Sequence, residues 1–399
     1  MVFPCVGLSF RTDSTVLPQS LTRDKTIRGA TIPVGDAELT YTTYEPYGVV
    51  AAITPWNYPA SNFATKVAPI LACGNTVVVK PAEQTPLVPL VPLRLAELAD
   101  QAGLPPGVVN VVTGDGPTAG AALAGHPRVP KVAFTGSSAT GRQLMAHGTT
   151  SITSFTSFTL ELGGKTASLV LPEADLDAAA DAIVHTAFVN SGQTCTAGSR
   201  VLVHREAHDA LLERVGTRTR ALRVGDPRDE RTHVGAIISA EQLDRIVEYA
   251  ELAKSEATVV VGGDRLHPAG FEDGWWFAPT VVDGVAPTSR LFREEIFGPL
   301  LTVTTYADLD EGIALVNDTE YGLAATVWGT RQDQVRRAVR QLDAGIVWAN
   351  TVHRLHPAVP YGGRRQSGVG LELGVEAQYE YMRPKTVWQG DTGWRSPWA

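Results

Sequence analysis

The chain has 399 residues, of which 44% are hydrophobic and 19% are charged, and its formal net charge is −8. This length predicts two or three domains, and the acidic balance argues against a broad surface for nucleic acid or anionic membranes. The three cysteines, at positions 5, 73 and 195, are too few and too widely spaced for a disulfide framework or a metal site, which indicates the reducing cytoplasm. The N-terminus, MVFPCVGLSFRTD, lacks the basic stretch of a signal peptide, and no apolar run reaches the length of a membrane span.

Short β-branched runs alternate along the chain with helical patterns. The first segment, Thr31–Tyr44, predicts a β-hairpin that turns at Gly35 and Asp36. The runs that follow predict strands at Val77–Val79, Val108–Val112, Val132–Phe134, Ser168–Leu171, Val201–His204 and Thr258–Val261. Residues 175–189 have apolar side chains at helical spacing, and a capping box at 239–242 predicts a helix through Lys254. A last strand is expected at Lys385–Trp388. This alternation predicts an α/β fold with doubly wound parallel sheets, which leaves the hairpin and the last strand to pair with another subunit.

Three polar residues are candidates for chemistry. Cys195 stands in NSGQTCTAGSR, among small residues that offer little apolar packing. It is either a structural cysteine or a nucleophile, whose thiolate would be stabilised at the start of a helix. Glu161 precedes two glycines in TLELGGK and is either a general base or a paired carboxylate. Asn57 in ITPWNYP is either a turn residue or an amide donor to an oxyanion.

Two glycine-rich turns are candidates for a phosphate site. The turn at Gly114 and Gly116 imitates a dinucleotide fingerprint, but its spacing is wrong and Pro117 interrupts it. The turn from Gly136 to Gly141 follows a predicted strand and opens a helix. Its amides and the Ser137 hydroxyl are suited to a pyrophosphate at a helix N-terminus.

Eight segments occur in the order seen in the aldehyde dehydrogenase superfamily, which the chain resembles from about residue 32 to residue 387. They are ITPWNYP, VVVKPAEQTP, FTGSSATG, LELGGK, NSGQTCTAGSR, EEIFGP, NDTEYGLAA and GGRRQSGVG. The resemblance implies NAD-dependent oxidation of an aldehyde to a carboxylic acid through a cysteine thiohemiacetal and thioester. It makes Cys195 the nucleophile and Glu161 the base that activates water to hydrolyse the thioester. It places the oxyanion between the Asn57 side chain and the Cys195 backbone N–H, with Lys66 supporting Asn57 and the proton network.

The resemblance also implies a cofactor site on the first sheet. Lys80 and Glu83 match residues that hold the adenosine ribose, and Ser137 matches a pyrophosphate contact. Glu295, with Phe297 beside it, matches the residue that holds the nicotinamide ribose. Further cofactor contacts are expected at Ile53, Thr54, Pro55, Trp56, Ala82, Gly116, Phe134, Thr135, Gly136 and Leu162. A carboxylate at position 83 would repel a 2′-phosphate, which favours NAD over NADP.

By the same resemblance, the fold has two Rossmann-like parallel-sheet domains and a small β arm for oligomerisation. The arm would comprise residues 29–46 with 381–394, the cofactor domain 47–162 with 367–380, and the catalytic domain 163–366. Residues 1–28 would be an atypical N-terminal segment, because the family normally carries a longer one there. We therefore expect exposed apolar surface that a homodimer or homotetramer covers, unless the protein is fragile or the reading frame begins elsewhere.

The expected substrate tunnel departs from the family pattern. Thr65 stands where a bulky aromatic residue is common, and the loop TVHRLHPAVPYGG carries His353, Arg354, Leu355 and Tyr361. This loop is either a solvated basic segment or the mouth of a tunnel for a polar or anionic aldehyde. Two other functions compete with the oxidation: a CoA-acylating dehydrogenase, against which Glu161 argues, and a catalytically silent structural or binding homologue.

Overall fold

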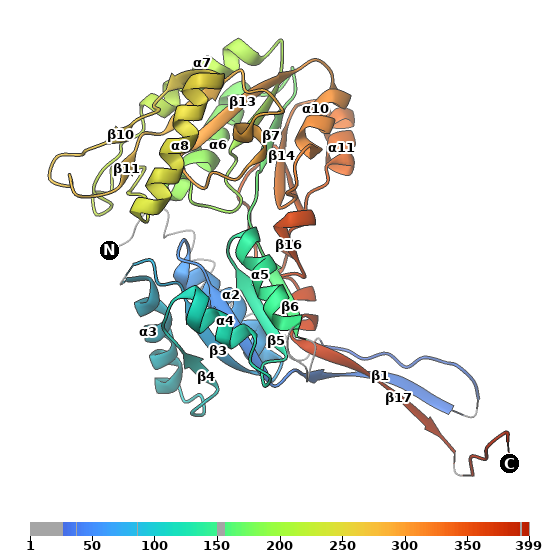
Figure 1. Cartoon of the computed structure of the whole chain (residues 1–399). Coiled ribbons are helices and arrows are strands. Elements are labelled where there is room, and N and C mark those ends of the chain that lie inside the picture. The colour runs from blue at the N-terminus through green and yellow to red at the C-terminus, as the bar shows by residue number, and fades with distance from the viewer. Residues whose placement is uncertain (1–26, 37, 86, 150–155, 392, 399) are drawn as a thin grey trace.

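The computed structural model describes residues 27–36, 38–85, 87–149, 156–391 and 393–398. Within these residues the chain forms two large open α/β sheets and a projecting two-stranded arm (Figure 1). The predicted α/β fold with parallel sheets is therefore confirmed. In this described part of the chain, no helix is both long and apolar enough to cross a membrane.

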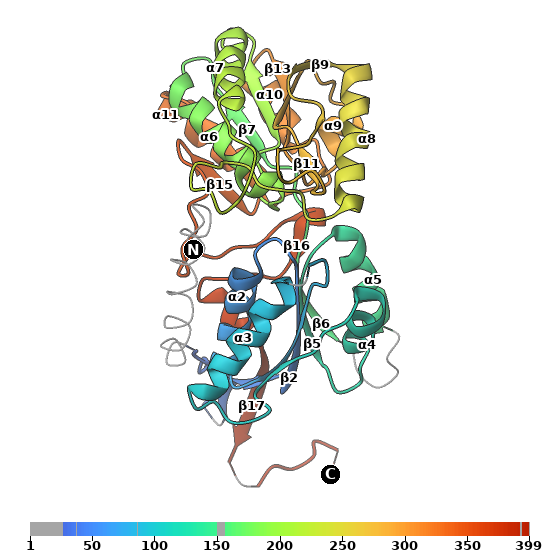
Figure 2. The same ribbon diagram turned by 90° about the vertical axis from the view of Figure 1, so that its left-hand side faces the viewer.

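The first sheet is covered by helices on both faces. Its strands, in spatial order, are β16 (Gly368–Val369), β6 (Ser157–Glu161), β5 (Lys131–Thr135), β2 (Val49–Thr54), β3 (Thr76–Pro81) and β4 (Val109–Val111). All neighbours run parallel except β16, which is antiparallel to β6. Helices α2 (Pro59–Ala72) and α3 (Leu87–Gln101) lie on one face, and α4 (Ala121–Ala124) and α5 (Ser138–Thr149) on the other (Figure 2).

The sequence of β2, VVAAIT, explains why this sheet is buried on both sides. Side chains alternate between the faces of a strand, so an uninterrupted apolar run supplies both. Val50 packs with Phe63 of α2, whereas the next residue, Ala51, packs with Leu144 of α5. A short π-helical turn, Gly116–Gly120, leads into α4.

The second sheet carries the larger core. Its strands, in spatial order, are β15 (Ile346–Ala349), β14 (Ala324–Trp328), β7 (Ala167–Val170), β8 (Arg200–His204), β13 (Leu300–Tyr306), β12 (Thr280–Asp283) and β9 (Thr258–Val261). Only the β12–β9 pair among them is antiparallel. The apolar cluster on one face includes α6 (Leu176–Phe188) and α7 (His208–Arg220). The cluster on the other includes α8 (Ala240–Glu256), α9 (Arg290–Arg293), α10 (Leu309–Asn317) and α11 (Gln332–Gln341). A small ladder pairs β10 (Arg265–Leu266) with β11 (Trp276–Phe277).

The predicted helix boundaries rest on side-chain caps. Asp175 accepts hydrogen bonds from the backbone N–H groups at the start of α6. Ser239 Oγ accepts one from the backbone N–H of Gln242, at 3.2 Å, and α8 continues two residues beyond the predicted Lys254. Both caps satisfy donors that a helix N-terminus leaves unpaired.

The chain crosses between the two sheets at adjacent positions. It passes from β6 to β7 through the LELGGK segment, and it returns from β15 to β16 past a 3₁₀ turn at Arg365–Ser367. The backbone N–H of Leu162 donates to the carbonyl of Ser367, at 2.9 Å, and Glu161 pairs with Gly368 in the ladder. Glu161 therefore stands at the junction of the two sheets. A short helix, α12 (Glu376–Tyr379), follows.

The arm pairs segments from opposite ends of the chain. Strand β1 (Glu38–Pro46) runs antiparallel to β17 (Met382–Gly390) along its whole length (Figure 1). The predicted tail strand is confirmed. The segment before β1 also returns antiparallel to it, as the predicted hairpin requires: Thr31 bridges Tyr41, and the N–H groups of Ile32 and Thr42 donate to the carbonyls of Thr40 and Ala30, at 2.8 and 2.9 Å. Strand β1 therefore has the tail strand as its long partner and the short preceding segment as a second one.

Candidate active site

Cys195 lies in a loop that joins α6 to β8. Three consecutive residues before it, Asn190, Ser191 and Gly192, have positive φ angles of 52°, 57° and 70°. At Gly192 a Cβ atom would come within 2.2 Å of the Gly298 carbonyl oxygen, so only glycine allows this close reversal.

The environment of the thiol differs from the one predicted. Cys195 follows a helix rather than beginning one, so the expected stabilisation by a helix N-terminus is wrong. The pKa of the Cys195 thiol is raised to about 12, chiefly by burial and also by the charges of Glu161 and Glu295, while hydrogen bonds with Tyr361 and the Thr196 backbone act to lower it.

Asn57 connects the cysteine loop to the first sheet. It follows β2, and its side-chain Nδ2 donates to the carbonyl of Gln193, two residues before Cys195, at 3.0 Å. In return, Asn190 Nδ2 donates to the Asn57 carbonyl at 3.2 Å. The hydroxyl of Tyr58 lies 2.9 Å from Thr194 Oγ1. These contacts place an amide donor from one sheet beside the cysteine loop of the other.

Glu161 is a buried carboxylate at the carboxyl end of β6. Neither of its side-chain oxygens has a hydrogen-bond partner within the described residues. Burial raises the pKa of Glu161 well above its usual range, the charge of Glu372 raises it further, and the charge of Lys66 opposes this. Lys66, on α2, forms a buried ion pair with Glu372. The sequence analysis missed Glu372, because 306 residues separate it from its partner and no local pattern marks it.

Gly163 and Gly164, which follow Leu162, let the backbone pass close to both Glu295 and Cys195. A Cβ atom at Gly164 would lie 2.3 Å from the Cys195 carbonyl oxygen, and one at Gly163 would lie 2.4 Å from Glu295 Oε2. Glu295 Oε1 accepts a hydrogen bond from the backbone N–H of Gly164 at 2.8 Å. Burial raises the pKa of Glu295 to about 7.

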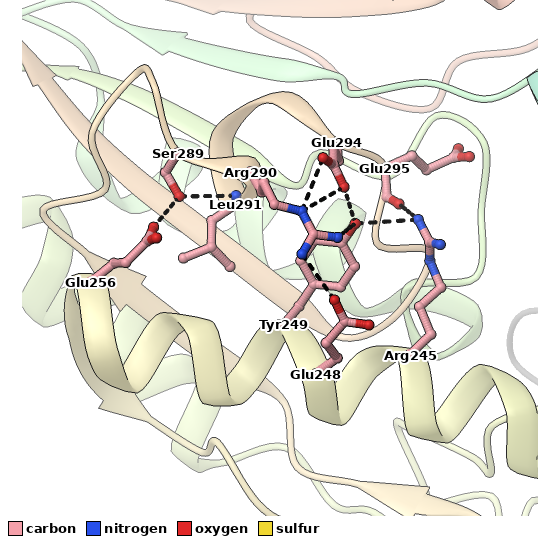
Figure 3. A network of polar contacts seen from close by, with 9 residues as sticks. All are labelled: Arg245, Glu248, Tyr249, Glu256, Ser289, Arg290, Leu291, Glu294 and Glu295. Carbon is pink, nitrogen blue, oxygen red and sulfur yellow. Dashed lines mark hydrogen bonds and ion pairs between the residues drawn. The ribbon is translucent and has the colours of Figure 1, made fainter.

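Helix α8 fixes the backbone that presents Glu295 (Figure 3). Arg245 Nη2 donates to the Glu295 carbonyl at 2.6 Å, and Tyr249 donates to the carboxylate of Glu294. The Glu295 side chain points away from this network (Figure 3). Phe297, with φ of 59°, lies edge-to-face with Trp56 from the first sheet, at 5.4 Å between ring centroids. The two sheets thus bring these cofactor candidates together.

The candidates for the adenosine half gather at the carboxyl end of β3. Lys80 Nζ lies 2.5 Å from Glu83 Oε2, and Glu83 Oε1 accepts a hydrogen bond from the backbone N–H of Gly116 at 3.2 Å. The Gly114–Gly116 turn, which fails as a fingerprint, therefore lies against Glu83. Ala82, which lies between Lys80 and Glu83 in sequence, is buried.

The remaining cofactor candidates lie at the ends of β2, β5 and β6. A Cβ atom at Gly136 would meet the Phe134 ring at 2.4 Å. Ser137 Oγ accepts a hydrogen bond from the backbone N–H of Thr140 at 3.1 Å, within the first turn of α5. Among the described residues, the buried hydroxyls of Thr54 and Thr135 have no hydrogen-bond partner. The other residues predicted here are Ile53, Pro55 and Leu162, of which Ile53 and Leu162 are buried.

The predicted substrate residues fall into two groups. Tyr361 reaches the nucleophile, with its hydroxyl 3.3 Å from Cys195 Sγ. His353 Nε2 lies 3.4 Å from Thr196 Oγ1, and its ring packs against Trp348. Thr65, in contrast, donates its hydroxyl to the carbonyl four residues earlier in α2, at 2.8 Å. Arg354 and Leu355 are exposed.

The interpretation of the loop as solvated and basic is wrong at His353. The ring of this residue is half-buried, and its centroid lies 5.8 Å from that of His185. Burial lowers the pKa of His353 to about 4, so the side chain is uncharged at neutral pH.

Comparison with known proteins shows the family of the chain. The model of the aldehyde dehydrogenase family matches residues 16–387. The chain belongs to the aldehyde dehydrogenase family. This family member is 45% identical, over 364 residues, to the aminoacetaldehyde dehydrogenase of Pseudomonas aeruginosa, a match that covers 91% of this chain and 71% of that protein.

Solved structures of aldehyde dehydrogenases share its fold. The NAD-dependent aldehyde dehydrogenase from Sinorhizobium meliloti is 40% identical, with a TM-score of 0.92 over 98% of this chain and 76% of that chain. The indole-3-acetaldehyde dehydrogenase AldA of P. syringae, solved in complex with NAD+, is 37% identical. Its TM-score is also 0.92, over 96% of this chain and 77% of that chain.

Proposed function

We propose that the protein oxidises a small aldehyde to a carboxylic acid with NAD as the oxidant. The observation that carries this proposal is the convergence of Cys195, the Asn57 amide and the Glu161 carboxylate, which has no hydrogen-bond partner among the described residues, at the junction of the two sheets. A nucleophile, an oxyanion donor and a base are the groups that acyl chemistry through a thioester requires.

The first step uses Cys195 and Asn57. The Cys195 sulfur loses its proton and attacks the aldehyde carbon, which gives a thiohemiacetal with a negatively charged oxygen. The Asn57 amide already reaches the cysteine loop, where its donor contacts the Gln193 carbonyl at 3.0 Å. A modest rotation of that amide, together with the Cys195 backbone N–H, would hold the oxyanion.

The last step uses Glu161. Once the carbon is oxidised, it remains bound to sulfur as a thioester, and water must attack it to release the acid. A carboxylate with a raised pKa is a stronger base than an exposed one, so Glu161 is suited to take the proton from that water. The buried Lys66–Glu372 pair lies within the same electrostatic network and would position and buffer this proton.

The chain's own residues fit a dinucleotide. Glu83 is positioned to accept hydrogen bonds from ribose hydroxyls, with Lys80 beside it. The buried hydroxyl of Thr135, which has no hydrogen-bond partner in the part of the chain that the structure describes, lies next to Gly136 and the first turn of α5 and offers polar contacts for a pyrophosphate. Glu295 offers its second carboxylate oxygen to the other ribose. NAD, when bound, supplies a nicotinamide ring that accepts a hydride.

The fit of NAD draws support from relatives. One related structure is described as NAD-dependent, and another contains NAD+. The Glu83 carboxylate supports the same choice, because a 2′-phosphate at that position would meet a negative charge.

The substrate we propose is a small polar aldehyde. Tyr361 and His353 bring a hydroxyl and an uncharged imidazole next to Cys195 and Thr196. An uncharged ring offers hydrogen bonds without a positive charge, which argues against an anionic substrate at this point. Aminoacetaldehyde is the first compound to test, because the relative from Pseudomonas aeruginosa, at 45% identity, is named an aminoacetaldehyde dehydrogenase.

The test is to follow NADH absorbance with the purified chain, NAD and a panel of small aldehydes, with and without CoA. We expect NADH to form and a free carboxylic acid to accumulate at a rate that CoA does not change. Product that appears as an acyl-CoA, and only when CoA is present, would identify a CoA-acylating enzyme. Absence of NADH with every aldehyde, in a folded protein that binds NAD, would overturn the proposed activity.

We further propose that the β1–β17 arm joins subunits into a homodimer or homotetramer. The arm projects from the molecule (Figure 1), and it exposes apolar side chains such as Leu39 and Trp388. A two-stranded ladder is marginal by itself and gains stability from a further partner. The check is molar mass by light scattering together with melting at several concentrations. A monomer whose melting temperature is independent of concentration would refute this assembly.

A further inference from the structure

Among the described residues, Tyr361 is the one whose side chain makes a polar contact with the nucleophilic sulfur. Its hydroxyl oxygen lies 3.3 Å from Cys195 Sγ, within the range of a hydrogen bond to sulfur. In sequence the two residues are 166 positions apart, so the fold rather than a local motif creates the contact.

The backbone of Tyr361 is firmly placed. Its N–H donates to the carbonyl of Glu372, and the N–H of Glu372 donates to its carbonyl, both at 2.7 Å. Glu372 is tied in turn to Lys66 of α2 through the buried ion pair. The next residue, Gly362, approaches Glu161 so closely that a Cβ atom there would lie 3.4 Å from its Oε1. The Tyr361–Gly362 segment thus passes between the nucleophile and the carboxylate of Glu161.

The charges around the sulfur make this contact important. Ionised Cys195 would lie half-buried near the carboxylates of Glu161 and Glu295, both of which oppose a negative charge on sulfur. Two groups act in the opposite direction, the Tyr361 hydroxyl and the backbone of Thr196, and the Tyr361 hydroxyl has the larger effect. The hydroxyl itself keeps its proton, because burial and the nearby Cys195, Glu161 and Glu372 raise the pKa of Tyr361 well above its usual value.

We propose that Tyr361 is a catalytic residue whose hydroxyl donates a hydrogen bond to the Cys195 thiolate and stabilises it for attack on the aldehyde. The S–H bond of Cys195 breaks, its proton passes to solvent, and the sulfur keeps the electron pair. A thiolate has no hydrogen to donate, so the bond must run from the tyrosine oxygen to the sulfur. This role rests on the proposed function in one respect: it takes Cys195 as the nucleophile.

The direct test is the pH dependence of Cys195 alkylation by iodoacetamide, which reacts with the thiolate. The full chain is treated over a range of pH, and the modified Cys195 peptide is quantified by mass spectrometry. Hydrogen bonds to charged groups are strong enough to move a pKa by about 1–2 units. In Tyr361→Phe we therefore expect the inflection to move to higher pH. Alkylation at neutral pH should slow by about 10- to 100-fold.

Tyr58→Phe is the matched control. Its hydroxyl contacts Thr194, the residue before Cys195, and not the sulfur. We expect Tyr58→Phe to keep the wild-type inflection, and both variants to melt close to the wild type because each loses a single oxygen. An unchanged or lowered inflection in Tyr361→Phe, or an equal shift in both variants, would overturn the proposal.

The outcome of this experiment does not depend on the outcome of the test of the proposed function. Alkylation needs neither an aldehyde nor NAD, so a shift in Tyr361→Phe would support the hydrogen bond even if no NADH were ever formed. Conversely, NADH formation by the wild type with no shift in the variant would remove Tyr361 from the catalytic residues and leave the dehydrogenase intact.

Discussion

Replacing Glu161 with glutamine should separate the two halves of the reaction. Glutamine has nearly the shape of glutamate but does not take a proton from water at neutral pH. Attack by Cys195 and oxidation of the carbon do not require a base at position 161 in the proposed scheme, whereas hydrolysis of the thioester does. The Glu161→Gln variant should therefore complete one oxidation and then stall.

The structure sets the size of the effect. Both carboxylate oxygens of Glu161 are buried and, within the described residues, unpartnered, so they are available to a water molecule that enters the site. General bases in such positions contribute about 10²- to 10⁴-fold. We expect a burst of about one NADH per active site in Glu161→Gln, followed by a steady rate lowered by about 10²- to 10⁴-fold.

The pH dependence has a defined direction. The pKa of Glu161 is raised, so the base is lost as pH falls through that value, and wild-type thioester hydrolysis should slow on the acid side. For stability the direction is opposite. A carboxyl with a raised folded pKa favours folding below its unfolded pKa and loses that contribution as pH rises. The melting temperature of Glu161→Gln relative to the wild type should therefore increase between pH 5 and pH 8.

Rapid mixing of enzyme, NAD and aldehyde, monitored by NADH absorbance, measures burst and steady rate together. Glu380→Gln is the control, because Glu380 lies in the same electrostatic network but pairs with Lys131 and Thr159. Its ratio of burst to steady rate should match the wild type. If burst and steady rate fall equally in Glu161→Gln, the carboxylate acts before hydrolysis. If neither changes, Glu161 is not the base.

Three further changes test other parts of the site. Cys195→Ala should abolish oxidation and leave NAD binding intact in a fluorescence titration. Cys73→Ala should keep activity, because the Cys73 thiol is buried and donates a hydrogen bond to a backbone carbonyl. Glu83→Ser should reduce the preference for NAD over NADP in kcat/KM by roughly tenfold, and equal use of both cofactors by the wild type would refute this role. Gly164→Ala places a methyl group 2.3 Å from the Cys195 carbonyl and should cost about 1–3 kcal/mol of stability with loss of activity. The same change at Gly390, where no described atom lies within 4 Å, should leave both stability and activity unchanged, and equal melting temperatures of the two variants would contradict the packing argument.

Much of the local structure follows from neighbouring residues. The apolar run around Val50 predicts a strand buried on both faces, and the Ser239 cap predicts where α8 begins, because both depend on dihedral preferences and side-chain period over a few residues. The glycines at 163 and 164 likewise indicate a close approach of the backbone. The sequence does not say that the atoms approached belong to Cys195 and Glu295.

Contacts between distant segments depended on the order of the strands. Asn57 meets the Gln193 carbonyl across 136 residues, and Lys66 meets Glu372 across 306, because the two crossings between the sheets bring these segments to one junction. The long ladder between β1 and the tail likewise joins segments from opposite ends of the chain.

The charge state of the site was also a tertiary property. From the sequence, Cys195 and His353 are a thiol among small residues and an imidazole in a basic loop. The structure half-buries both side chains, and removal from water disfavours a charged side chain, which raises the pKa of Cys195 to about 12 and lowers that of His353 to about 4. The sequence alone therefore determined which chemical groups the protein has and much of its secondary structure. Only the packing of the two sheets decided how far those groups lie from water and from one another, and hence in which protonation state they meet a substrate.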